Sequence, residues 1–160
     1  MIMKKIILSA AAILVFGFAN AQDTQFGVKA GVDLATVKTD LGPLGKVSAS
    51  ETGFFVGAFV DLGLSENFSV QPEVLYVAIT DSNFLSVPIL AKYSIAESFS
   101  LVAGPSLNYF MDAEEDEFKV NVDFGGIYDI TENLDINAKY SLGMGDVQVS
   151  GVFIGAGYKF

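Results

Sequence analysis

Apolar and polar residues alternate along most of this chain with a period of two. The alternation is clearest between positions 134 and 142, and the last residues, 150–160, repeat it. Beyond residue 21 no segment shows a long apolar period of 3.6 residues, which an amphipathic helix would need. A period of two is typical of β-strands whose two faces meet different environments. The pattern therefore predicts an all-β protein in which helices are a minor part.

One short polar turn occurs three times, as SENFSV from Ser65, AESFSL from Ala96 and TENLDI from Thr131. A repeated turn indicates that one supersecondary unit, here a β-hairpin, is repeated. Tight turns at one end alternate with four connections of more variable length at the other, which predicts an eight-stranded antiparallel up-and-down β-barrel. The predicted strands are 25–37, 52–62, 68–79, 84–94, 99–111, 118–129, 134–143 and 150–160, and the four connections are 38–51, 80–83, 112–117 and 144–149.

Three prolines, Pro72, Pro88 and Pro105, fall inside predicted strands. Proline has no backbone N–H to donate to a β-ladder. We therefore expect each of them to mark a β-bulge or a local break in an otherwise closed barrel.

The tyrosines distinguish a membrane barrel from a soluble one. A soluble carrier barrel would turn its apolar face inward around a ligand cavity. Here all six tyrosines share the apolar face of their strands, and they fall toward both strand ends. Amphipathic rings at two levels of one apolar face are typical of membrane interfaces. The sequence thus predicts a transmembrane barrel with an aromatic girdle of Tyr76, Tyr93, Tyr109, Tyr128, Tyr140, Tyr158 and Phe160.

The opposite face of the strands carries charges of both signs in nearly equal number. Buried charges must be paired or hydrogen-bonded, and the interior of an eight-stranded barrel is just wide enough to be filled by side chains. We therefore predict a plugged lumen with a polar network in place of an open pore. Its predicted members are Lys29, Asp33, Asp61, Glu73, Lys92, Lys119, Asp123, Asp129, Asp135, Lys139 and Lys159.

The first 21 residues have the pattern of a secretory signal peptide. A basic start is followed by a short apolar run and by small residues at Ala19 and Ala21. We predict cleavage after Ala21 and a barrel domain over 22–160. That product has 7 lysines and 19 acidic residues, hence a net charge of −12. Such a charge argues against binding nucleic acid, and the absence of cysteine excludes a disulfide or a cysteine-linked lipid anchor.

Residues suited to catalysis are scarce in this chain. It has no histidine, cysteine or arginine, which removes the commonest general bases, thiol nucleophiles and guanidinium clamps. Ser141 and Lys139 could form a nucleophile and base, but two residues apart on one strand they more naturally line the lumen together. We therefore predict that the protein is not an enzyme and needs no cofactor.

One cluster of acidic residues has chemical interest. Ca²⁺ prefers oxygen ligands, so these carboxylates could bind Ca²⁺ or meet the divalent ions that bridge lipopolysaccharide. The cluster lacks the spacing and the glycine of an EF-hand loop, and a solvated acidic loop is the simpler interpretation. The candidate ligands are Asp112, Glu114, Glu115, Asp116 and Glu117.

Several segments resemble the family of outer-membrane β-barrel domains that includes PorT-like proteins. They are FGVKAGVDLATV near residue 26, QPEVLYV at 71, FLSVPILAKY at 84, GPSLNYF at 104 and the terminal GAGYKF. The resemblance covers nearly the whole chain after residue 21 and implies that the three strand prolines are family features. It also implies that the barrel-insertion machinery reads the alternating C-terminal strand ending in Phe160. The predicted loops are short, which argues against an adhesive or secretory role carried by long loops.

These observations lead to a small barrel in the outer membrane of a Gram-negative envelope, surrounded by lipid. The leading hypothesis is a non-enzymatic protein that is structural or binds an envelope partner through its loops. The resemblance suggests, as an alternative, a component of a PorT-like secretion or transport assembly. A third hypothesis is a soluble periplasmic carrier barrel.

Overall fold

The computed structural model describes residues 5, 23–79, 82–110, 118–144 and 147–160. The predicted signal peptide, apart from residue 5, and the acidic segment 112–117 lie outside these residues, so both remain predictions. Within the described residues, no helix is long and apolar enough to cross a bilayer.

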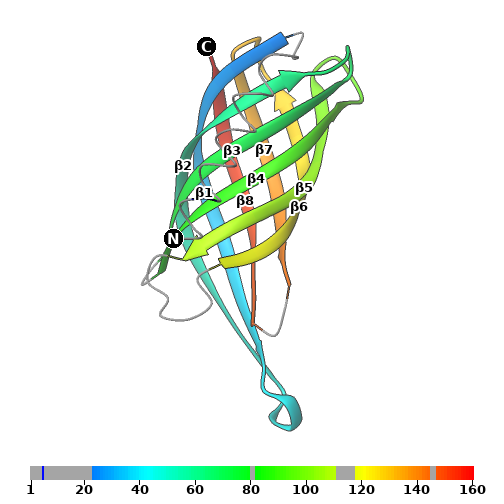
Figure 1. Cartoon of the computed structure of the whole chain (residues 1–160). Coiled ribbons are helices and arrows are strands. Elements are labelled where there is room, and N and C mark those ends of the chain that lie inside the picture. Colours follow the sequence, from blue (N-terminus) through cyan, green and yellow to red (C-terminus); the bar gives the residue numbers. More distant parts are fainter. Residues whose placement is uncertain (1–4, 6–22, 80–81, 111–117, 145–146) are drawn as a thin grey trace.

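Eight antiparallel strands close into one barrel, in which each strand pairs with its sequence neighbours and β8 pairs with β1 (Figure 1). The predicted eight-stranded up-and-down barrel is therefore confirmed. The strands are β1 (Asp23–Asp40), β2 (Lys46–Gly63), β3 (Phe68–Ile79), β4 (Ser82–Ser94), β5 (Phe99–Phe110), β6 (Phe118–Asp129), β7 (Leu134–Gly143) and β8 (Val147–Lys159).

The three repeated turns have the same backbone hydrogen bonds. In the first, the N–H groups of Leu64 and Ser65 both donate to Phe68 O. The second turn repeats this pattern at Phe99 O and the third at Leu134 O. Similar sequences therefore make the same turn three times, and all three lie at the end of the barrel that also holds the C-terminus (Figure 1). We call this the short-turn end and the opposite end the loop end.

Glycines allow the first and last strands to approach closely where the barrel closes. Gly31 on β1 faces Gly155 on β8. A Cβ atom on Gly31 would lie 2.1 Å from Ile154 O, and one on Gly155 would lie 2.4 Å from Ala30 O. Larger residues at either position would push these two strands apart.

The hairpin of β1 and β2 extends much further than the predicted loop 38–51 allows. Backbone pairing continues to Asp40 opposite Lys46, and a short 3₁₀ turn, η1 (Gly42–Leu44), closes the hairpin. Figure 1 shows it projecting well beyond the other strands at the loop end. The prediction of an irregular connection here was wrong. Residues 46–52 are all exposed, so this part of β2 has no alternation of apolar and polar residues from which a strand could be predicted.

The strand prolines interrupt pairing without adding a residue. Pairing between β2 and β3 lapses at Pro72, between β3 and β4 at Pro88, and between β4 and β5 at Pro105. On both sides of each gap the register is unchanged, whereas a bulge would shift it by one residue. The predicted local breaks are therefore present, and the predicted bulges are wrong. The gaps form a diagonal seam across neighbouring strands.

Candidate functional site in the barrel interior and at its rims

Four charged side chains from four different strands meet near the middle of the lumen. Lys29 Nζ bonds to Glu73 Oε2. Lys139 Nζ lies 2.9 Å from Asp123 Oδ2 and 4.0 Å from Glu73 Oε1. All four side chains are buried, so each charge depends on its neighbours for compensation. We call Lys29, Glu73, Asp123 and Lys139 the ionic cluster.

Two further ion pairs lie nearer the short-turn end. Lys92 Nζ is 2.8 Å from Asp61 Oδ2, and Lys159 Nζ is 3.1 Å from Asp129 Oδ1. Asp135 is buried and accepts a hydrogen bond from Asn137 Nδ2 at 2.9 Å. The strand alternation thus places most of the predicted polar residues inside the lumen, where they form several separate groups.

Hydroxyl and amide groups extend the ionic cluster toward the loop end. Asp123 Oδ1 accepts hydrogen bonds from Ser106 Oγ at 2.8 Å and Ser141 Oγ at 2.6 Å. Ser141 Oγ in turn accepts one from Asn121 Nδ2. Ser141 is therefore held by Asp123 and does not bond to Lys139. Sequence reasoning missed Ser106 and Asn121, although the alternation of each strand places both side chains on the inward face, as it does for Asp123.

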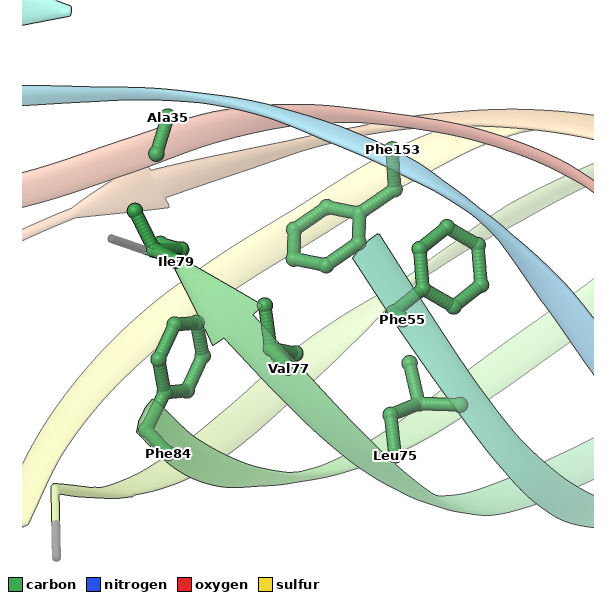
Figure 2. Packing of buried hydrophobic residues seen from close by; sticks show 7 residues of the cluster. All are labelled: Ala35, Phe55, Leu75, Val77, Ile79, Phe84 and Phe153. Atoms are coloured by element: carbon green, nitrogen blue, oxygen red, sulfur yellow. The ribbon is translucent and has the colours of Figure 1, made fainter. Parts of the chain in front are cut away.

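Toward the loop end the lumen is filled by apolar side chains, which the sequence interpretation did not anticipate. On β1 and β3 this cluster lies on the loop side of the ionic cluster. Phe55 and Phe153 meet edge to face with ring centroids 5.3 Å apart. Figure 2 shows the converging side chains, which we call the outer apolar cluster: Ala35, Phe55, Leu75, Val77, Ile79, Phe84 and Phe153.

Little empty space remains within the described lumen. Two internal voids of about 10 Å³ each, one beside the ionic cluster and one beside Asp33, have room for about one water molecule. A larger recess of about 450 Å³ opens at the short-turn end, where Lys92 and Asp61 form part of its lining. A carrier of small molecules would need an enclosed cavity of several hundred Å³.

Aromatic side chains cover two levels of the outer face. Near the short-turn end, Phe68 lies opposite Tyr93 and Phe99 lies opposite Tyr128. Tyr158 and the 74% exposed Phe160 lie at this level too.

Toward the loop end, Tyr109 contacts Phe118 and Phe124 contacts Tyr140. Tyr76 is exposed one strand away from Phe54, which is 68% exposed. Sequence reasoning had missed Phe54, Phe118 and Phe124 at this level, although the alternation of their strands places all three on the outward face. All six tyrosines lie on the outer face.

Two further predictions concern Lys119 and the acidic segment 112–117. Lys119 is half-buried on the inward face of β6, and no ion pair of this residue falls within 4.0 Å among the described residues. The acidic segment 112–117 lies outside the described residues. Among those that are described, no group of three or more acidic, histidine or cysteine side chains could hold a metal ion.

A closed eight-stranded barrel with an apolar, aromatic-banded outer face and charged groups inside is the architecture of a small membrane-spanning β-barrel. The sequence matches the outer membrane protein beta-barrel domain over residues 8–160, and the chain belongs to this family. The family and the outer face together indicate the outer membrane and exclude the soluble carrier barrel. The narrower PorT-like resemblance stays a prediction.

Solved structures of other small barrels have the same fold. Ail, the attachment invasion locus protein of Yersinia pestis, has a TM-score of 0.59 at 18% identity, covering 87% of this chain and 100% of that one. Neisserial surface protein A has a TM-score of 0.58 at 20% identity, with coverage of 87% and 100%. A designed transmembrane β-barrel has a TM-score of 0.57 at 18% identity, with coverage of 88% and 99%. The sequence has no significant match among curated proteins.

Proposed function

We propose that this protein is a non-enzymatic outer-membrane barrel with a closed lumen, and that it binds an extended segment of a partner protein along the projecting part of β2. The observation that carries the proposal is the difference in length between the two ladders of β2. This strand pairs with β1 as far as Lys46 but with β3 only as far as Phe54. Residues 46–52 are all exposed and therefore have a free edge on the side away from β1, with no described strand paired to them.

A free edge of this kind can accept another strand. Its unpaired N–H and C=O groups bind an extended peptide through main-chain hydrogen bonds, as in β-augmentation. Apart from Val47, which is 56% exposed, the side chains along the edge are small or polar, and KVSASET contains no aromatic residue. Such an edge selects for an extended backbone and a few polar contacts. Leu44 at the tip is 87% exposed and adds an apolar contact.

Membrane geometry disfavours a second copy of this chain as the partner. Two barrels in one membrane are related by an axis along the membrane normal, so their β2 strands run in the same direction outward. A symmetric pair of free edges joined in an antiparallel sheet needs strands that run in opposite directions. Short turns of such barrels face the periplasm, so we infer that the projecting hairpin lies outside the cell. The partner is then a different protein outside the membrane.

The charges of the hairpin argue against a polyanionic ligand. Ail has been crystallised in complex with the heparin analogue sucrose octasulfate. In the present chain, Lys38 and Lys46 on the projecting hairpin are offset by Asp40 and Glu51, and the whole chain has no arginine. A net charge of −10 opposes binding of a sulfated polymer.

The test begins with photo-crosslinking from position 48 on living cells of the source bacterium, followed by purification of the captured partner. Its affinity is then measured for three forms of the barrel in lipid nanodiscs. One is wild type, and one has residues 37–49 replaced by Asn-Gly, so that the paired residues Thr36 and Ser50 flank a tight turn. The third, Leu41→Ser with Leu44→Ser, changes the tip and keeps the edge.

We expect the shortened hairpin to weaken binding by more than about tenfold, or ~1.4 kcal/mol, and the tip variant to retain most of it. Partner binding should also slow amide hydrogen exchange at 46–52. Full binding to the shortened form, or protection at the tip alone, would refute edge pairing. If the captured protein belongs to a secretion assembly, its identity would support the alternative that this barrel is a component of a PorT-like assembly.

The closed lumen has its own measurement. The apolar packing between Phe55 and Phe153 and the small size of both internal voids support a barrel without an ion-conducting path. Planar-bilayer recording should show no large stable conductance. Regular steps of constant size from the purified protein would contradict the proposal.

A further inference from the structure

Asp33 is a buried carboxylate with no lysine Nζ within 4.0 Å among the described residues. Its side chain is 1% exposed, and Asp33 Oδ1 has no hydrogen-bond partner among the described residues. The carboxylates of Glu73, Asp123, Asp61 and Asp129 each lie within 4.0 Å of a lysine Nζ. Buried charges in proteins are paired or bind a cation, because an isolated ion in an apolar interior is costly.

A small void adjoins this carboxylate. It measures about 10 Å³, which is room for one water-sized occupant. Phe84, Phe110 and Phe153 form part of its wall and limit the access of bulk water. Its polar lining consists of Asp33, Asn108, Asn121, Ser141 and Ser150.

Two of the donors in the polar lining are already used by other acceptors. Asn121 Nδ2 is committed to Ser141 Oγ and Val149 O, both at 2.9 Å. Ser141 Oγ donates to Asp123 Oδ1 at 2.6 Å. Neither of these groups donates to Asp33 Oδ1, which has no hydrogen-bond partner among the described residues and favours a positively charged occupant.

We propose that this void binds one monovalent cation, with Na⁺ the best match, through Asp33 and the neighbouring amide and hydroxyl oxygens. One carboxylate balances one positive charge, so the site is neutral when occupied. Divalent ions take more oxygen ligands and usually several carboxylates. A void with room for one water fits Na⁺ better than the larger K⁺.

Two features show how the barrel accommodates this site. A Cβ atom on Gly151 would lie only 2.4 Å from Asp33 Oδ1, so glycine at this position leaves room for the carboxylate. Asp33 lies opposite Gly53, at the level where β2 leaves its ladder with β3. The site is therefore close to the loop end, and an ion can enter without crossing the ionic cluster.

The experiment compares unfolding of the full barrel in detergent with sodium chloride or tetramethylammonium chloride at the same ionic strength. Tetramethylammonium is too large for the void. Wild type should gain stability as RT ln(1 + c/Kd), where c is the sodium concentration, which is about tenfold in the unfolding equilibrium constant at a sodium concentration about ten times Kd. Retention of ²²Na⁺ on gel filtration should approach one ion per barrel, with weaker retention in excess potassium.

Asp33→Asn should abolish both the sodium increment and the retention of ²²Na⁺. Asp61→Asn is the matched control, because it removes a lumen carboxylate outside this void and should leave both intact. If Asp33→Asn does not fold, Gly151→Ala tests the same site by displacing the carboxylate. Two results would overturn the proposal in favour of a bound water beside a neutral carboxyl group. One is equal wild-type stability in the two salts, and the other is a gain in stability with sodium that persists in Asp33→Asn.

Discussion

Two neighbouring clusters in the barrel interior, the ionic cluster and the outer apolar cluster, are stabilised by different forces. The ionic cluster holds Lys29, Glu73 and their partners through charge, so each member depends on a specific neighbour. The outer apolar cluster, shown in Figure 2, is held by area and shape. Apolar packing tolerates exchange for residues of similar volume, whereas an unpaired buried charge is expensive. The loop end should therefore be the more permissive half of the lumen.

The largest expected effect comes from breaking the ionic cluster. Glu73→Gln removes the negative charge that compensates Lys29 and leaves that lysine buried. We expect the free energy of unfolding to fall by about 3–5 kcal/mol. Urea titration followed by far-UV circular dichroism measures it, since the chain has no tryptophan.

The exposed pair of Asp40 and Lys46, whose charged atoms are 4.0 Å apart, provides the control for this variant. Asp40→Asn should change the free energy of unfolding by less than about 0.5 kcal/mol. A loss as small as this for Glu73→Gln would show that water or a rearranged lysine compensates the buried charge.

The ion pair nearer the short-turn end tests whether charge itself is needed. Asp61→Asn alone should cost about 1.5–3 kcal/mol, because Lys92 loses its charged acceptor. Replacing both partners, Asp61→Leu with Lys92→Met, should recover most of that loss, since apolar residues of similar volume can replace a buried pair. If the double variant is the less stable of the two, the pair contributes more than mutual compensation.

The strands and turns could be predicted from the sequence because both depend on local chemistry. The turns beginning near Ser65, Ala96 and Thr131 share residues and make the same hydrogen bonds. Alternation places Asp135 and Lys139 inside because their apolar neighbours face outward. Where one face is polar and the other apolar, the direction of every side chain follows.

The outer apolar cluster escaped prediction because it lies where alternation disappears. In β3 the inward residues change from Gln71 and Glu73 to Leu75, Val77 and Ile79, while the outward neighbours remain largely apolar. A strand that is apolar on both faces gives no period from which to assign a side. The free edge of β2 escaped for the opposite reason, because residues 46–52 are exposed on both faces and give no apolar period.

The outer apolar cluster offers a direct comparison between neighbouring residues. Phe55 is 3% exposed inside the barrel, and Phe54 faces outward. Phe55→Leu should lower the free energy of unfolding by about 1–2 kcal/mol, because the smaller side chain leaves part of the edge-to-face contact with Phe153 unfilled.

Phe54→Leu makes the same chemical change on the outer face and should cost less than about 0.5 kcal/mol. Both variants are compared by urea titration in one detergent. Equal losses at the two positions would mean that the loop-end lumen is not tightly packed.

The smallest expected effect is the coupling energy between the ionic cluster and the outer apolar cluster. Lys139 Nζ lies 4.9 Å from the ring centroid of Phe153, so one cation–π contact joins the ionic cluster to the outer apolar cluster. A double-mutant cycle with Lys139→Met and Phe153→Leu should give a coupling energy of about 1 kcal/mol, the range for a desolvated contact of this kind. A cycle with Lys92→Met in place of Lys139→Met should be additive, because Lys92 pairs with Asp61 and does not contact Phe153. Additivity in both cycles would mean that the ionic cluster and the outer apolar cluster stabilise the barrel independently of each other.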